Sequence, residues 1–144
     1  MKILNNCAIF LIASFFAIST SQAKSKTEWY KTFENESATF FIDTHMLIYE
    51  NGYHMFWLIE NFKKPFLKRY KSILRYTFFD CKRKTYKFFN SFAYASQMAS
   101  GKDFIKLPHN NSWSDSSNKE SIFKTLDLIC NDSYIKTKTR GLNP

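Results

Sequence analysis

Phe78-Phe79-Asp80-Cys81 is the stretch that decides the fold. It ends a run of strand-forming residues that begins at Ile73, and its cysteine has one plausible partner, Cys130. Cys130 lies at the end of an amphipathic helical pattern near the C-terminus. A disulfide between the two cysteines would link that helix covalently to a central strand and close the chain from Cys81 to Cys130 into one loop. Whether the bond forms depends on the compartment in which the protein folds.

The N-terminus has the pattern of a secretory signal peptide. Lys2 precedes an apolar run over residues 7–18, and small and polar residues follow up to Ala23. This order predicts cleavage after Ala23 and removal of residues 1–23. The alternative is a membrane anchor, but the apolar run spans only about 18 Å as a helix, short of the roughly 30 Å of a bilayer core. We therefore expect an exported protein, located in the periplasm, at the cell surface or outside the cell.

Two cysteines remain after that cleavage, because Cys7 is discarded with the signal peptide. Two cysteines in an exported chain favour one disulfide, between Cys81 and Cys130. The alternative is a pair of free, buried thiols. Closing a loop of about 50 residues stabilises a fold by roughly 4 kcal/mol on the chain-entropy account.

The chain is strongly basic. Removal of Lys2 leaves 20 Lys and Arg against 12 Asp and Glu, a net charge of about +8. The basic residues gather at residues 63–71, 82–87 and 136–140. Such a surface attracts anionic partners, here a host extracellular-matrix protein or an anionic polysaccharide, while export argues against nucleic acid. The alternative is a plain solvated face. The candidate ligand-binding residues lie in the first two clusters: Lys63, Lys64, Lys68, Arg69, Lys71, Lys82, Arg83 and Lys84.

The chain between residues 29 and 107 has the composition of short strands. Alternating and β-branched or aromatic runs predict strands at residues 29–33, 37–43, 44–49, 53–62, 72–81, 85–94 and 104–107. Asn51-Gly52 between two such runs predicts a tight hairpin, because both residues tolerate positive φ. The basic stretch at residues 63–71 contains a proline and is expected to form a mobile loop.

Aromatic residues are unusually frequent, with 16 Phe, 8 Tyr and 3 Trp in the whole chain. We expect Trp57 to be buried in the main face of the sheet and Trp113 to pack beside the helix. Other rings should remain exposed beside lysines, a composition suited to binding sugars or proteins through stacking and cation–π contacts.

The periodicity changes near the C-terminus. Ile122, Phe123, Leu126, Ile129 and Cys130 recur at helical spacing on one face. Ser117 followed by Glu120 fits a capping box, so the predicted helix covers residues 117–130. The folded domain should then cover residues 24–132, and the polar, basic tail at residues 133–144 is predicted to be disordered.

The sequence contains no clear catalytic constellation. His45, His54 and His109 are scattered singly, without metal-ligand spacing. Asp43 and Asp80 both end predicted strands and could pair as acid and base, although acidic residues there are more often turn formers. A Gly-x-Ser-x-Gly elbow is missing, and glycine is too scarce for a phosphate-binding loop. We therefore expect neither catalytic residues nor a metal or other cofactor.

The order of these features resembles a known family. The shared elements, in chain order, are Trp29, Phe41-Ile42-Asp43, the Trp57 strand, Phe79-Asp80-Cys81-Lys82, Trp113 and a short helix ending in Cys130. They are similar to those of the surface-adhesin protein E-like family of small exported bacterial proteins, over residues 28–132. The resemblance implies an antiparallel sheet with a helix held on it by the Cys81–Cys130 bridge. It also implies a role at the cell envelope, where the namesake binds host matrix and serum proteins.

The predicted fold class is α+β, an antiparallel sheet of about six strands with one C-terminal helix packed on it and one disulfide. The predicted function is non-catalytic binding at the envelope or outside the cell, as an adhesin for host matrix proteins or acidic polysaccharides. One alternative is a periplasmic protein-binding or inhibitor module. The other is a small secreted hydrolase, for which the chain offers only Asp43, Asp80 and its histidines.

Overall fold

The secondary structure follows the predicted order of many strands and one late helix. A computed structural model of the chain describes residues 27–108 and 111–131, so the predicted signal peptide and basic tail lie outside the described residues. Two 3₁₀ turns, η1 (Gln97–Ala99) and η2 (Ser116–Asn118), precede β7 and the helix α1 (Glu120–Asn131). The strands are β1 (Trp29–Glu34), β2 (Ala38–Asp43), β3 (Ile48–Glu50), β4 (Tyr53–Phe66), β5 (Tyr70–Asp80), β6 (Thr85–Tyr94), β7 (Phe104–Lys106) and β8 (Ser114–Asp115).

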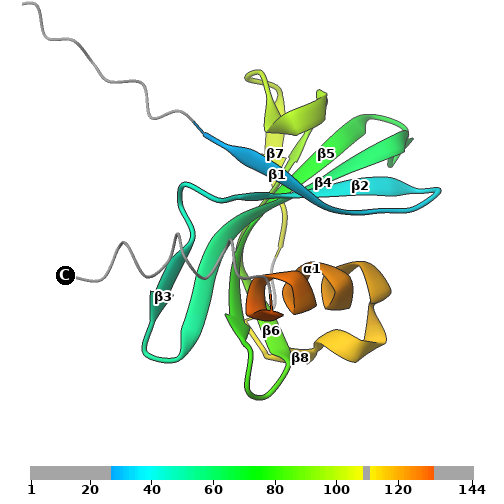
Figure 1. The fold of residues 1–144 in the computed structure, drawn as a ribbon. Coiled ribbons are helices and arrows are strands. Elements are labelled where there is room, and N and C mark those ends of the chain that lie inside the picture. Colours follow the sequence, from blue (N-terminus) through cyan, green and yellow to red (C-terminus); the bar gives the residue numbers. More distant parts are fainter. Residues whose placement is uncertain (1–26, 109–110, 132–144) are drawn as a thin grey trace, which may run out of the picture.

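All these strands join one antiparallel sheet. Its main path is β1-β2-β4-β5-β6-β7, while β3 pairs with β4 and β8 pairs with β6. Figure 1 shows α1 against one face of the sheet, with the β4–β5 hairpin ending at the upper right and the β5–β6 turn at the bottom. The predicted α+β class, antiparallel sheet and C-terminal helix are thereby confirmed.

Turn chemistry positions the two hairpins that flank β4. Asn51 and Gly52 adopt positive φ angles of 51° and 85° between Glu50 and Tyr53, which pair directly across the turn. This is the two-residue connection that an Asn-Gly pair predicts, because its twist matches that of the strands. At the other end of β4 the strand continues through Pro65 to Phe66, so the expected loop at residues 63–71 is instead the end of a long hairpin.

The hydrophobic core lies between the sheet and α1. Three residues of the predicted stripe are buried in one cluster with apolar residues of β2, β4 and β5, while the buried Ser121 and Thr125 lie outside that stripe. The main members are Phe40, Ile42, Phe56, Leu58, Phe79, Ile122, Leu126 and Ile129. Full burial of one such side chain stabilises a fold by about 1.5–3 kcal/mol. Burial of these side chains is therefore the main contribution that holds the helix on the sheet.

The disulfide between Cys81 and Cys130 is present, as predicted, and the alternative of two free thiols is wrong. It joins the last turn of α1 to the residue that follows β5, with the two Cα atoms 5.9 Å apart. Both cysteines pack against the edge of the core. The bridge therefore fixes the end of the helix over the β5–β6 end of the sheet.

The row of β4 side chains that faces α1 is not the predicted one. Phe56 and Leu58 lie in the core beneath the helix, whereas Trp57 is half-buried on the opposite face of the sheet. Both rows of this strand are apolar, so hydrophobicity alone does not distinguish them. The Phe56 row ends in Glu60, which can be buried because Arg75 forms an ion pair with it at 2.6 Å.

Trp113 and the start of the helix also differ from the predictions. Trp113 is 41% exposed and stacks on Tyr53, with 5.4 Å between ring centroids, instead of packing beside α1. The α-helix begins at Glu120, because Ser117 is part of η2 and donates from Oγ to Asp115 at 2.7 Å. Asp115 caps η2, since its carboxylate also accepts from the backbone N–H of Ser117, and Ser117 does not cap α1.

Candidate functional site

The eight predicted ligand-binding residues occupy two separate places. Lys63, Lys64, Lys68, Arg69 and Lys71 lie at the β4–β5 hairpin, called here the hairpin end, and Lys82, Arg83 and Lys84 lie in the β5–β6 turn, called the disulfide end. The 11 residues of β5 separate these ends, a span of roughly 33 Å at about 3.3 Å per residue. The structure therefore does not bring the two clusters together into one site.

At the disulfide end, backbone and side chains are engaged within the fold. Asp80 Oδ1 accepts from the backbone N–H groups of Lys82 and Arg83 at 2.9 and 3.0 Å. The carbonyl of Lys84 accepts from both the backbone and the hydroxyl of Ser116. The Lys84 ammonium lies 5.6 Å from the ring centroid of Phe123. A ligand at this end would compete with the contact of Lys84 and with the ion pair between Arg83 and Asp80 at 3.7 Å, whereas Lys82 is exposed and has no ion pair among the described residues.

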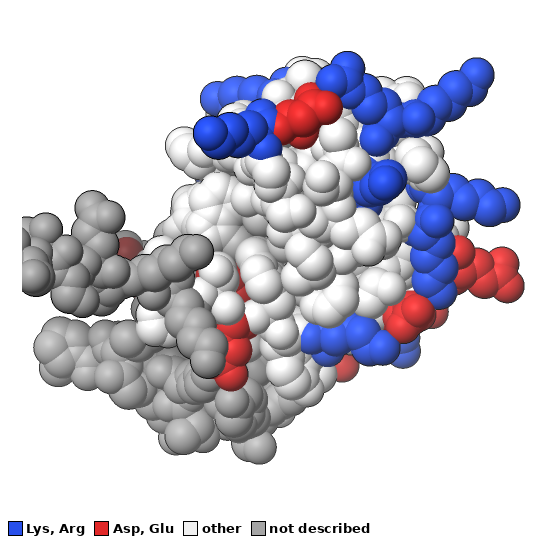
Figure 2. Space-filling view, turned by 90° about the horizontal axis from the view of Figure 1, so that it is seen from above, with Lys and Arg blue, Asp and Glu red and all other residues white. Residues whose placement is uncertain are grey.

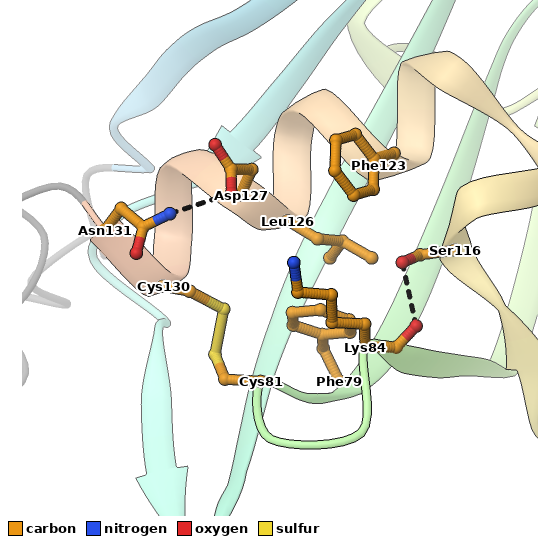
Figure 3. Close-up of a pocket in the computed structure, with 9 residues that line it drawn as sticks. All are labelled: Phe79, Cys81, Lys84, Ser116, Phe123, Leu126, Asp127, Cys130 and Asn131. Carbon is orange, nitrogen blue, oxygen red and sulfur yellow. Dashed lines mark hydrogen bonds between the residues drawn. A yellow bond between two sulfur atoms is a disulfide. The ribbon is translucent and has the colours of Figure 1, made fainter.

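A small pocket adjoins the disulfide end. Figure 3 shows Lys84 rising from the β5–β6 turn toward α1 beside the Cys81–Cys130 bridge. The volume of this pocket is about 120 Å³. The charged groups on its wall are Lys84 and Asp127, and the carboxylate of Asp127 accepts a hydrogen bond from Asn131 at 2.7 Å. This volume admits a few water molecules but not a saccharide.

The two aspartates considered as an acid–base pair serve as turn formers. Asp43 Oδ1 accepts from the backbone N–H groups of His45 and Met46, as Asp80 does at its own turn. Each carboxylate ends a strand and satisfies amides that the sheet leaves unpaired. This arrangement agrees with the structural alternative and gives the hydrolase hypothesis no pair of facing carboxylates.

The hairpin end holds some of its cations in ion pairs. Glu34 of β1 binds Lys31 and Lys63, each at 2.9 Å, and these two ammonium groups lower the pKa of the Glu34 carboxyl to about 2. Asp103 accepts two hydrogen bonds from Arg69, at 2.8 and 2.9 Å, and thereby raises the pKa of the guanidinium. These pairs are exposed, so each contributes little to stability.

Three further lysines at the hairpin end are available to a ligand. Lys64, Lys68 and Lys71 are exposed, and none forms an ion pair with another residue of the described part of the chain. Figure 2, the view from above, shows Lys and Arg side chains along the upper and right-hand margins around a largely uncharged middle. The right-hand margin is the side to which the β1–β2 and β4–β5 hairpins extend in Figure 1.

An open hollow of about 480 Å³ lies beside this hairpin. It is lined by two of the predicted cations, Lys63 and Lys71, together with Phe62, Pro65, Ser96 and Gln97. Ser96 and Gln97 were not predicted as site residues, because residues 95–103 had only the composition of a loop. Their position next to the lysines depends on how that loop folds back over the sheet, which local sequence patterns do not encode.

The outer face of the sheet, opposite α1, carries half-buried and exposed aromatic rings next to a lysine. The composition predicted rings beside lysines of this kind. The ammonium of Lys87 lies 5.1 Å from the ring centroids of both Phe78 and Trp113. Phe78 also contacts Tyr76, and Tyr76 contacts Trp57. Lys87 was outside the predicted site, although the pairing of Phe78 with Lys87 in the β5–β6 hairpin would have indicated it.

The described histidines show no sign of a metal centre. His54 Nδ1 lies 3.4 Å from Sγ of Cys81, and its ring lies against Tyr49. The residues at 27–108 and 111–131 include no group of three His, Cys, Asp or Glu placed to hold a metal ion. His109 lies outside these ranges.

Comparison with known proteins identifies one family. The family described as surface-adhesin protein E matches residues 29–131. Searches of the curated proteins and of the solved structures found no match. In the part of the chain that the structure describes, no helix has the length and apolar character needed to cross a membrane.

Proposed function

The chain belongs to the surface-adhesin protein E family, whose role is adhesin-like and whose location is exported or at the surface, and from this premise we propose a ligand class and a binding surface. The protein is a non-catalytic binding protein of the cell envelope or the extracellular space. It recognises acidic polysaccharide, either free or attached to host matrix proteins, through the hairpin end.

The observation that carries this proposal is the set of unengaged cations at the hairpin end. Lys64, Lys68 and Lys71 have no acidic partner among the described residues. At the disulfide end Lys82 is likewise without one, but Arg83 pairs with Asp80 at 3.7 Å and the Lys84 ammonium lies over the ring of Phe123. A cluster of exposed like charges attracts polyanions and accelerates their encounter with the protein. The turn-forming roles of Asp43 and Asp80 support a binding function over hydrolysis.

Salt elution from a heparin column tests the proposal. The hairpin variant carries Lys64→Ser, Lys68→Ser and Lys71→Ser, and its matched control carries Lys82→Ser, Arg83→Ser and Lys84→Ser. Both lose three positive charges. We expect both to elute at lower salt than the unchanged protein, and the hairpin variant at the lower salt of the two. Attraction should weaken steeply with salt, because the screening length falls from about 10 Å at 0.1 M to about 3 Å at 1 M.

Two outcomes would contradict the proposal. If the unchanged protein is not retained at low salt, acidic polysaccharide is not its ligand. If the two variants elute together, the column reports net charge and the hairpin end has no special role. Circular dichroism of both variants checks that the fold is kept.

Cell fractionation addresses the remaining alternative, a periplasmic protein-binding or inhibitor module. An adhesin requires surface exposure, so protease added to intact cells should digest the protein. Protection from protease in intact cells, with release by osmotic shock, would favour the periplasmic module.

A further inference from the structure

We propose that the hollow between the β4–β5 hairpin and η1 is a binding site for one carboxylated sugar of an acidic glycan. The inference rests on the proposed function and narrows it from a charged surface to a defined site. The site combines cations, an apolar wall and uncharged polar groups, and each of the three parts fits a different feature of a uronic acid.

The cations come from two neighbouring strands. Lys63 on β4 and Lys71 on β5 both line the hollow. Glu34 holds the ammonium of Lys63 at 2.9 Å, while Lys71 is exposed and has no ion pair among the described residues. Hydrogen bonds between ammonium groups and a carboxylate are about twice as strong as neutral ones, so these lysines would anchor the acid group of the sugar.

The remaining lining suits the uncharged part of a sugar ring. Phe62 stacks on Phe66, with 5.6 Å between centroids, and together with Pro65 it forms an apolar wall. Ser96 supplies a hydroxyl and Gln97 an amide, which can exchange hydrogen bonds with sugar hydroxyls. An apolar wall with a few convergent polar groups is typical of small-molecule sites, and about 480 Å³ lies in their usual size range. An inorganic anion would use the cations alone.

Buried side chains on the outer face hold the loop that carries Ser96 and Gln97. The backbone N–H of Met98 donates to Asn61 Oδ1 at 2.8 Å, and that of Ala99 donates to Ser72 Oγ at 3.0 Å. Ser72 in turn donates to the carbonyl of Ser96 at 2.6 Å. Asn61 and Ser72 are only 8% and 0% exposed, so the polar groups of the sheet here serve to position a surface loop.

The same loop is held in a conformation that its residues rarely adopt. Met98 and Ala99 have φ angles of 55° and 49°, in the left-handed region that favours glycine. Such residues cost of order 1–3 kcal/mol each and persist where the surroundings fix them, often at binding sites. The hydrogen bonds from Asn61 and Ser72 supply that fixation, and the hollow is thereby organised before any ligand arrives.

The test is an NMR titration of the labelled exported chain with tetragalacturonate. Its methyl ester, which has the same length without the charge, and sodium sulfate serve as comparison ligands. Tetragalacturonate should shift the amide signals of residues 71 and 96–99. Lys71→Gln and Gln97→Ala should each raise the Kd roughly tenfold, the loss expected for one charge-assisted or well-made hydrogen bond. The matched control is Lys68→Gln, which removes the same charge outside the hollow and should change the Kd less than Lys71→Gln.

The outcomes separate this inference from the proposed function. Equal effects of Lys71→Gln and Lys68→Gln, or an unchanged Kd in Gln97→Ala, would overturn the hollow as the site while heparin retention still supports the proposed function. If the methyl ester binds as tightly as tetragalacturonate, the site does not require a carboxylate. If sulfate binds as tightly, the site does not recognise a sugar. A protein that binds neither tetragalacturonate nor heparin would contradict the proposed function itself.

Discussion

The two ends of β5 carry similar clusters of basic residues but differ in what the fold does with them. At the disulfide end, Asp80, Ser116 and Phe123 contact the backbone or side chains of the turn at Lys82–Lys84, and the bridge fixes α1 above it. At the hairpin end, the exposed Lys63 and Lys71 line one side of an open hollow, and buried side chains hold the neighbouring loop.

This difference shows that charge density alone does not identify a binding surface. A cation contributes most to ligand binding when no group of the protein already occupies it. At the disulfide end Arg83 pairs with Asp80 and Lys84 lies over Phe123, although both side chains are exposed. With the proposed function, stability and binding depend on opposite ends of one strand. The following changes should affect one end and spare the other.

Loss of the disulfide should have the largest effect. Replacing both Cys81 and Cys130 with serine should lower the free energy of unfolding by about 4 kcal/mol, because the bridge closes a loop between residues 49 positions apart. Urea denaturation measures this loss. Under conditions where the variant remains folded, its retention on heparin should stay close to that of the unchanged protein, because the hairpin end is far from the bridge.

Thiol labelling provides an independent check of the bridge. The exported chain, unfolded without reductant, should not react. Two labelled cysteines per chain, or an unfolding midpoint that the double substitution leaves unchanged, would refute the stabilising role of the bridge.

The disulfide end was largely predictable from the sequence. Cys81 follows a strand pattern and Cys130 ends a helical one, and both patterns depend on local periodicity. The Asp80 turn and the Asn51-Gly52 hairpin are likewise encoded within a few residues. These features can be predicted without knowing which distant residues are in contact, and the predictions were therefore confirmed.

The hairpin end and the faces of the sheet were predicted less well, for a physical reason. Trp57 and Phe56 lie in equally apolar rows, and which row is covered depends on where a helix some 65 residues later packs. Ser96 and Gln97 reach the hollow only because Asn61 and Ser72, far back in the chain, bind their loop. Long-range contacts of this kind leave no periodic pattern in the sequence.

A smaller effect is expected from removing an anchor of the hairpin end. Asn61→Ala takes away the acceptor for the N–H of Met98 and should lower the free energy of unfolding by about 1–3 kcal/mol. Ser116→Ala is the matched change at the disulfide end, where it removes one hydrogen bond to Lys84. Amide exchange should rise at residues 96–99 in the first variant and near Lys84 in the second. Faster exchange at both ends in either variant would show that the ends are coupled and would contradict the comparison.

The smallest effect concerns the charge of Glu34 at the hairpin end. Lys31 and Lys63 lower its pKa from 4.5 to about 2 in the folded protein. A carboxyl with a lowered folded pKa stabilises the fold above its unfolded pKa, and this contribution is lost as the pH falls from about 4.5 toward 2. An NMR titration of the Glu34 side chain should therefore find a midpoint near 2. Lys31→Gln should move that midpoint toward 4.5, whereas Lys64→Gln, which removes a cation that forms no ion pair among the described residues, should move it much less. A midpoint near 4.5 in the unchanged protein would mean that solvent screens the pairs and that Lys63 is as free to bind a ligand as Lys71.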